Sequence, residues 1–245
     1  MKILYAGDSP AGGPANYLLG ILRSIRAEVT HVPPSDILTP EISLKKYDAV
    51  ILSDFSKKNL PPAAEKNLVK QIENGAGLLM VGGWGSFSGP FGGWRGSEIE
   101  KLLPVQCLTG DDRLNFPGGA CLTFKGEHPA LKGIPIENAP VICGLNQVQP
   151  KPSGKVVLTV RRVLYDGKAV RLEPREHPLL IIADAKGKRG RSAALATDFA
   201  PHWCGGLIDW GAKSVKLPVV KDIRIEIGET YLKFGSQLIS WTAGK

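Results

Sequence analysis

The chain has 245 residues, of which 43% are hydrophobic and 22% charged, and its formal net charge is +8. These values are ordinary for a globular protein built from one large domain, or from one domain with an extension. No apolar run approaches the roughly 18 residues needed to span a bilayer, and the first strand passes directly into a polar turn. We therefore expect a cytoplasmic protein with no membrane segment and no secretory signal.

The positive charge raises nucleic-acid binding as one hypothesis, but the basic residues are scattered along the chain. Their densest cluster, residues 186–191 (KGKRGR), lies between two apolar runs and is typical of a solvated hairpin loop. It lacks the interleaved aromatic residues on which bases stack, so we disfavour a nucleic-acid partner. The four cysteines show no CxxC spacing and are expected to be reduced and mostly buried.

The first half of the chain alternates predicted strands with predicted helices. In chain order these are a strand at 2–7, a helix at 14–26, a strand at 28–34, a strand at 48–54, a helix from 61 to about 75, a strand at 77–83 and a short helix after a capping-box pattern at 97–100. Such alternation predicts a parallel, doubly wound sheet covered by helices on both faces.

The second half is predicted to be rich in β structure and to end in a helix. Strands are expected at 120–124, 156–160, 163–172, 179–185 and 191–198, and a helix at 230–243. Asp166-Gly167 and the residues around Gly187 are expected to form hairpin turns. With no low-complexity linker between the halves, we predict one α/β domain over residues 1–245. Its predicted architecture is a three-layer sandwich with a mostly parallel central sheet and a β-rich C-terminal elaboration.

Polar residues and glycines follow three of the predicted parallel strands, where ligand crevices of such sheets lie. Seven of the fifteen residues from 82 to 96 are glycine, and their amides could approach a ligand closely. The predicted ligand-binding residues here are Asp8, Ser9, Asp54, Gly83, Trp84 and Gly85. Known nucleotide loops do not fit, because Gly13-Pro14 replaces the Lys and Ser/Thr of a P-loop and the first strand lacks GxGxxG.

A second polar stretch, residues 196–211 (ATDFAPHWCGGLIDWG), follows the predicted strand at 191–198. Asp198 and Trp203 join the predicted ligand-binding residues. His202 is either a general base or ligand at the crevice, or a loop residue packed on Trp203, and the sequence leaves both open. A metal site from Asp8, Asp54 and His202 has no short ligand spacing behind it, so we assign neither a metal nor a cofactor.

The sequence resembles the class I glutamine amidotransferase-like proteins, which have a flavodoxin-like sandwich. The resemblance covers nearly the whole chain and is carried by GDSPAGGPANYL, YDAVILSD, GAGLLMVGGWGSFSGPFGGWRGSEIEKLLPV, DDRLN and ATDFAPHWCGGLIDW. It implies a strand-to-helix elbow with a nucleophilic cysteine and a His-x-Glu pair. Here the elbow holds Gly83, Trp84, Gly85 and Ser86, and Cys204 stands where the acid two residues after His202 is expected. We therefore predict a pseudoenzyme without glutaminase activity that binds a small molecule.

The alternative is a hydrolase in which His202 works with Ser86 or with an activated water. It requires the Ser86 hydroxyl to reach His202, with Asp198 or Asp54 orienting the imidazole ring. The competing interpretation of Ser86 is a serine that bonds the backbone of its own loop.

Large aromatic residues in the glycine-rich stretch bear on oligomeric state. Phe87, Phe91 and Trp94 predict either a surface for self-association or a lid, unless they pack on the core of their own domain. Asp111-Asp112-Arg113 is interpreted as a solvated turn with its own ion pair. We assign no role to His31, His128 or His177.

Overall fold

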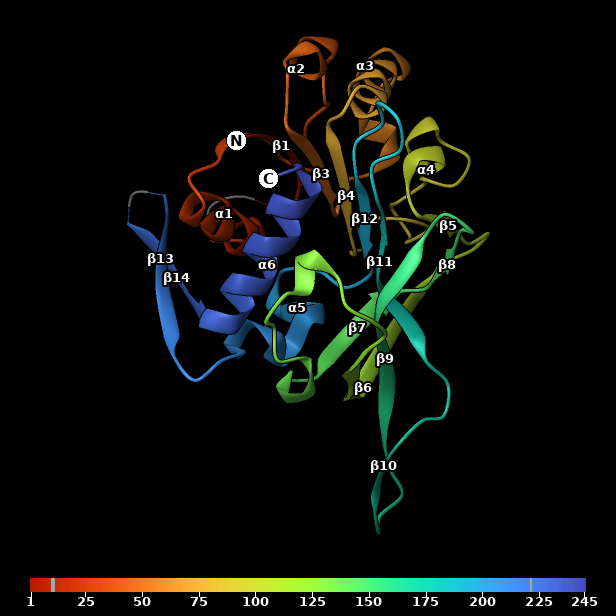
Figure 1. The fold of residues 1–245 in the computed structure, drawn as a ribbon, viewed down its shortest axis with the longest axis vertical. Helices are drawn as coiled ribbons and strands as arrows, with labels where there is room; N and C mark the ends of the chain where they lie inside the picture. Colours follow the sequence, from red (N-terminus) through yellow and green to blue (C-terminus); the bar gives the residue numbers. More distant parts are fainter. Residues whose placement is uncertain (10–11, 221) are drawn as a thin grey trace.

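The computed structural model describes residues 1–9, 12–220 and 222–245. Its main sheet has ten strands in the order β2-β1-β3-β4-β12-β11-β9-β6-β7, with β10 paired to β9 (Figure 1). The pairs β2-β1, β1-β3, β3-β4 and β4-β12 are parallel, and the pairs from β12 to β7 are antiparallel. This mixed α/β sheet, parallel where helices alternate with strands, confirms the predicted fold class.

The elements of the first half follow the predicted order with one unpredicted short helix, α2, and the second half adds several elements. The helices are α1 (Ala15–Ser24), α2 (Pro40–Leu44), α3 (Pro62–Glu73), α4 (Glu98–Leu102), α5 (Pro201–Cys204) and α6 (Glu229–Thr242). The main-sheet strands are β1 (Lys2–Gly7), β2 (Glu28–Val32), β3 (Ala49–Ser53), β4 (Gly77–Val81), β6 (Arg113–Phe124), β7 (Ile142–Asn146), β9 (Lys155–Tyr165), β10 (Val170–Leu172), β11 (His177–Ala183) and β12 (Ser192–Leu195). Two small sheets pair β5 (Val105–Cys107) with β8 (Val148–Pro150), and β13 (Ser214–Val220) with β14 (Ile223–Gly228).

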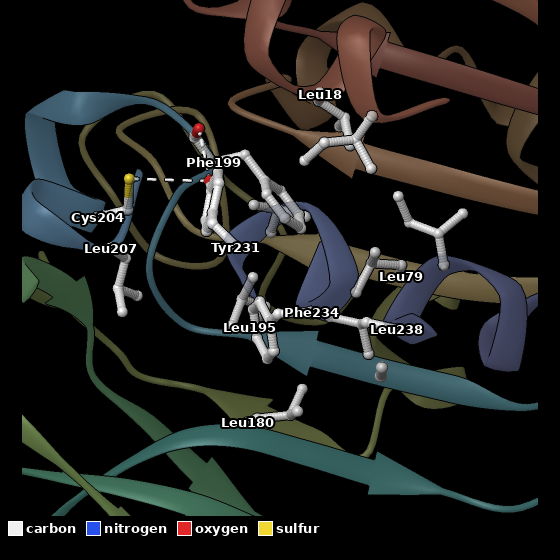
Figure 2. Packing of buried hydrophobic residues seen from close by; sticks show 14 of the residues in the cluster. Leu18, Leu79, Leu180, Leu195, Phe199, Cys204, Leu207, Tyr231, Phe234 and Leu238 are labelled. Atoms are coloured by element: carbon white, nitrogen blue, oxygen red, sulfur yellow. Dashed lines mark hydrogen bonds between the residues drawn. The ribbon is translucent and has the colours of Figure 1, made fainter. Parts of the chain in front are cut away.

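Helices cover both faces of the parallel strands because side chains on these strands alternate between two cores. Leu79 and Val81 of β4 pack with residues of α1 and α6, whereas Leu78 and Met80 pack with residues of α3 and α4. Figure 2 shows the first core, in which Leu18 of α1 and Leu238 of α6 lie near Leu79. The predicted three-layer arrangement follows from this alternation.

The short helix α4 begins where the capping-box pattern predicts. The Ser97 hydroxyl accepts a hydrogen bond from the Glu100 amide at 3.0 Å, and the Glu100 carboxylate accepts one from the Gly96 amide at 2.5 Å. The same carboxylate also accepts the Cys107 amide of β5 at 2.7 Å. These bonds fix the far end of the glycine-rich loop to the body of the protein.

Several elements beyond residue 104 were not predicted, namely β5, β7, β8, β13, β14 and the short helix α5. The hairpin of β13 and β14 contains Pro218, next to a shift in register, and proline argues against a strand in sequence. Strand β7 ends in Gly-Leu-Asn, a sequence typical of a turn. It forms a strand because it pairs with β6. Within the described part of the chain, no helix is long and apolar enough to cross a membrane.

Candidate functional site

The register of the parallel strands brings the predicted polar residues to one edge of the sheet. Gly7 of β1 pairs with Ser53 of β3, and Ser53 pairs with Val81 of β4. Leu195 of β12 also pairs with Val81. Asp8, Asp54, Gly83 and Asp198 therefore follow the carboxyl ends of neighbouring strands, as expected for a crevice in an open parallel sheet. The structure confirms that Asp8, Asp54 and Gly83 follow neighbouring strand ends, and ligand binding at this edge stays a prediction.

Asp8 and Asp54, each directly after its strand, both have a positive φ angle. Their φ angles are 45° and 51°, in the left-handed region that Asp tolerates better than most residues. Directly before Asp8, Gly7 has φ of 126° and so little space that a Cβ would overlap the Ser53 carbonyl oxygen. Glycine is needed there because strands β1 and β3 approach closely as they end.

Buried polar neighbours hold Asp8. The Tyr5 hydroxyl donates a hydrogen bond to Asp8 Oδ2 at 2.6 Å, and the Tyr5 ring stacks on His31 with centroids 4.6 Å apart. His31 Nε2 in turn lies 2.7 Å from the Gly7 carbonyl oxygen. Burial raises the pKa of Asp8 to about 7; the nearby Ser53 hydroxyl and the hydrogen bond from Tyr5 oppose this rise, and the charge of Asp54 adds to it. Tyr5 was not predicted as a site residue, because a single hydroxyl in an otherwise apolar strand forms no recognisable sequence motif.

Asp54 connects the end of β3 to the glycine-rich loop. Its Oδ1 accepts the Gly85 amide, and its own amide donates to Ser86 Oγ at 3.0 Å. Burial raises the pKa of Asp54, while the amides of Gly85 and Trp84 and the charge of His202 act in the opposite direction. Asp54 is thus electrostatically coupled to His202, one of the two predicted catalytic residues.

Asp198 is the third carboxylate at this edge of the sheet. Its Oδ1 accepts the Cys204 amide at 2.8 Å. Burial raises its pKa well above the ordinary value; the amides of Cys204 and Trp203 oppose this rise, and the negative charges of Asp8 and Asp54 strengthen it. The three carboxylates therefore form one electrostatic group, which we call the carboxylate crevice (Asp8, Asp54 and Asp198) after the ligand crevice predicted at this edge of the sheet.

Buried polar atoms on the same chain segments lack partners. Ser53 directly precedes Asp54, Thr197 directly precedes Asp198, and Asn16 lies in the first turn of α1. Each of these three residues has a buried side-chain oxygen with no hydrogen-bond partner in the described part of the chain: Asn16 Oδ1, Ser53 Oγ and Thr197 Oγ1. Such atoms are uncommon in folded proteins, and a bound ligand or water would satisfy them.

The glycine-rich loop uses its amides within the protein. The Gly83 amide donates to Asn146 Oδ1 at 2.9 Å, and the Gly85 amide donates to Asp54. At Gly89 and Gly92 a Cβ would come within 2.6 Å and 2.5 Å of backbone oxygens of the same loop. This corrects the expectation that the amides of Gly83 and Gly85 face a ligand: the glycines are required by tight packing of the loop on itself and on Asp54.

A buried polar cluster fixes the start of this loop. Asp112 accepts the Asn146 side-chain amide at 2.6 Å and the Ser88 backbone amide at 2.7 Å, and Asn146 also donates to the Gly83 carbonyl at 3.2 Å. Asp112 is fully buried, so its assignment to a solvated turn is wrong. The neighbouring pair of Asp111 and Arg113 is present, at 2.7 Å. Asn146 gave no signal in the sequence, because its partners are distant along the chain.

The aromatic residues of the loop divide into two sets. Phe87 and Trp94 are buried, and Trp94 Nε1 donates to the carbonyls of Phe55 and Gly85 at 2.9 and 3.1 Å. Trp84 and Phe91 are 43% and 60% exposed, with ring centroids 6.3 Å apart. Packing on the core thus accounts for two of the three residues expected at a surface. Phe91 also lines a cleft of about 520 Å³ beside the loop 56–62.

The two predicted catalytic residues, Ser86 and His202, do not form a hydrogen bond with each other in the described part of the chain. Ser86 is 1% exposed, and its hydroxyl accepts the Asp54 amide, a backbone partner that lies at the end of β3 and not, as had been expected, in the loop of Ser86. His202 is exposed on α5, and in the described ranges no hydrogen bond links it to Ser86. Trp203 is buried, donating Nε1–H to Asn115 at 3.0 Å, and does not form an open crevice wall. Ser9 is exposed, and its carbonyl accepts the Ala15 amide at 3.2 Å.

Cys204 is the cysteine nearest the carboxylate crevice. Its thiol lies 3.8 Å from the Tyr231 hydroxyl, the contact drawn in Figure 2. Burial, strengthened by the charge of Asp198, raises the pKa of the Cys204 thiol well above its ordinary value. A reactive thiolate requires the opposite shift. Over residues 1–9, 12–220 and 222–245, no three His, Cys, Asp or Glu side chains are grouped so that they could hold a metal ion.

Comparison with known proteins places the chain in a family and identifies solved structures with the same architecture. The family model described as "Putative glutamine amidotransferase" matches residues 11–218. The chain belongs to this glutamine amidotransferase-like family. No curated protein matches it.

Solved structures share the architecture of this amidotransferase-like protein. A cytoplasmic protein of Salmonella typhimurium LT2 is 23% identical with a TM-score of 0.72, covering 99% of both chains. A second cytoplasmic protein of Salmonella typhimurium is 25% identical with a TM-score of 0.65, covering 83% of this chain and 90% of its own. A ThuA-like protein of Bacteroides uniformis is 14% identical with a TM-score of 0.55, covering 99% and 91%.

Proposed function

We propose that this amidotransferase-like protein binds a small molecule at the carboxylate crevice and does not release ammonia from glutamine. The observation that carries the binding proposal is the burial of Asp8, Asp54 and Asp198 at one edge of the sheet, which raises the pKa of each; the charge of Asp54 adds to the rise at Asp8 and Asp198. A ligand that brings N–H donors or a positive charge favours the ionised form of such carboxylates. We therefore propose a ligand bearing an amino or guanidino group, and a cytoplasmic location.

The proposed lack of glutaminase activity rests on the hydrogen bonding of Ser86 and on the raised pKa of Cys204. At the elbow, the Ser86 hydroxyl is engaged by the Asp54 amide. The Cys204 thiol is buried and its pKa is raised, so it is protonated at neutral pH and a poor nucleophile. Both features argue against the covalent step that a glutaminase requires.

Binding is tested by thermal shift with a panel of amines and guanidines, each compared with its neutral amide or alcohol analogue. A ligand at about 100 times its dissociation constant should stabilise the protein by roughly 2.7 kcal/mol. This stabilisation should be lost in Asp54→Asn and Asp198→Asn and retained in the exposed control Asp36→Asn. Hits that survive both crevice variants would overturn the proposed site, as would a panel whose neutral members bind equally well.

Loss of glutaminase chemistry is tested by ammonia release from glutamine, with and without a thiol alkylator. We expect no turnover in the wild type or in Cys204→Ala. Turnover that the alkylator or Cys204→Ala abolishes would contradict the proposal.

A hydrolase that uses an activated water is the second candidate, supported by His202, which is exposed and whose charge lowers the pKa of Asp54. The version that uses Ser86 requires its hydroxyl to leave the Asp54 amide, so we favour the water. Chromogenic ester and phosphate panels test this candidate. Activity that is lost in His202→Ala and kept in Ser86→Ala would support it, and a panel without turnover would remove it.

A further inference from the structure

The end of β9 and the strand β10 form a two-stranded hairpin, which we call the arm (residues 163–172). Up to Arg162, β9 pairs with β11 and β6. From Val163 to Tyr165 it pairs with β10, and with no other strand in the described part of the chain. Figure 1 shows this hairpin extending beyond the rest of the molecule, at the bottom of the view. Because a two-stranded hairpin is at best marginally stable in water, the arm gains stability from packing against another surface.

One face of the arm is apolar and exposed. Tyr165 pairs with Val170, and Val163 pairs with Leu172. These four side chains lie on the same face, because residues two apart in a strand and residues directly opposite in a pair point the same way. Tyr165 and Val170 are 71% and 69% exposed, more than any other large apolar side chain among the described residues. Neighbouring exposed apolar groups of this kind mark an interaction surface.

The same sheet carries an apolar hollow of about 1020 Å³ between the end of β6 and residues 127–137. The apolar side chains that line this hollow are Leu122, Phe124, Pro129, Leu131, Ile134 and Ile136. Phe124 pairs with Leu158 of β9, and Tyr165 lies seven residues further along that strand. At about 3.3 Å per residue, the arm of a chain leads away from its own hollow. An arm that fills the hollow therefore comes from another molecule.

The arm and the rim of the hollow carry opposite charges. Residues 161–175 contain five basic and two acidic residues. Lys168, near the tip, is exposed and forms no salt bridge within the described ranges. At the hollow, the charged lining residues are Glu127 and Glu137 against one lysine, Lys132. Both glutamates are exposed, and neither is in a salt bridge with another described residue. The arm thus matches the hollow in polarity and in charge.

We infer that the arm of one copy of this protein docks in the hollow of a second copy, so that two molecules exchange arms around a twofold axis. In this dimer Tyr165 lies against the Phe124 wall, and Lys168 lies near Glu137. A twofold axis forms the contact twice and doubles the buried area. Each copy carries a net charge of +8, so the opposite local charges are needed to offset the general repulsion. The inference is independent of the carboxylate crevice, because the two regions share no residue.

Sedimentation velocity at a series of concentrations tests the apolar contact. The wild type should form a dimer that dissociates on dilution. Tyr165→Ala should raise the dissociation constant of the dimer at least about tenfold, and Phe124→Ala at least about fivefold, because buried aromatic residues contribute most to such contacts. Leu44→Ala is the matched control: Leu44 is 67% exposed on α2, outside both surfaces, and its removal should leave the dimer unchanged.

Exchange of charges tests which surfaces meet. Lys168→Glu and Glu137→Lys should each raise the dissociation constant about fivefold, because each places like charges together. An equimolar mixture of the two variants should form dimers as well as the wild type does, since each arm then meets a rim of opposite charge. Lys58→Glu changes the net charge as Lys168→Glu does, at an exposed lysine outside both surfaces, and should not weaken the dimer.

Three results would overturn the inference. The first is a wild type that stays monomeric at every concentration. The second is a dimer that Tyr165→Ala dissolves and Phe124→Ala leaves intact, because the arm then docks elsewhere than in the hollow. The third is a mixture of Lys168→Glu and Glu137→Lys that associates no better than either variant alone.

Discussion

The buried Asp112 and the three acids of the carboxylate crevice both adjoin the glycine-rich loop, and they differ in how their charges are accommodated. Asp112 accepts hydrogen bonds from Asn146 and from the Ser88 amide, in a cluster that also holds Gly83. The carboxylate crevice places three acids within reach of one another's charge, beside unpartnered oxygens of Ser53 and Thr197. Asp112, bonded to groups of its own protein, stabilises the fold, whereas three acids that act on one another's charge form a place where a positively charged ligand can add binding energy.

The largest effect is expected where the satisfied cluster is broken. Asp112→Ala leaves the Asn146 side chain and the Ser88 amide without their acceptor in a buried site. We expect a loss of about 3 kcal/mol in the free energy of unfolding, measured by urea denaturation. Asp111→Ala, which removes only an exposed ion pair, should change it by less than about 0.5 kcal/mol. Similar values for the two variants would contradict the structural role of Asp112.

In the carboxylate crevice we expect a smaller change in the free energy of unfolding, and here a substitution should increase it. The pKa of Asp8 is about 7 when folded and near 3.8 when unfolded, so the folded state binds more protons between these values. Stability from this group is therefore present below about pH 4 and lost as the pH rises to 7. Asp8→Asn should remove this loss and be more stable than the wild type by about 2 kcal/mol at pH 8.

Urea denaturation at several pH values between 4 and 8 measures this difference. The gain of Asp8→Asn over the wild type should grow as the pH rises, and Asp36→Asn, at an exposed site, should show no such trend. If the two curves run parallel across this range, Asp8 does not titrate as its surroundings indicate.

The smallest effect is expected at Ser86, which lies next to the carboxylate crevice but bonds like a structural residue. Ser86→Ala removes the acceptor of the Asp54 amide, and we expect a loss of about 1 kcal/mol in the free energy of unfolding. Ligand stabilisation at the crevice should be retained. If the variant instead abolishes ligand binding while its stability is unchanged, Ser86 belongs to the site.

The sequence predicted the parallel half of the fold because its signals are local. Apolar strands ending in Asp8 and Asp54, and the capping box at Ser97, each lie within a few residues. The Asp112–Asn146 cluster was not predictable, because its hydrogen bonds join residues 34 positions apart. The burial of Trp203 and the engagement of Ser86 likewise depend on Asn115 and Asp54, which only the tertiary structure brings near.

The left-handed backbone at Asp8 and Asp54 limits which amino acids these positions accept. In a saturation library selected only for folding, Asp, Asn and Gly should be recovered at both positions, and Val, Ile and Thr should be depleted, because branching at Cβ clashes in this conformation. The folding screen would thus enrich Asp without any chemistry being required of it. A second selection, for ligand binding, should then separate Asp from Asn and Gly, and the difference between the two selections measures what the carboxylate itself contributes.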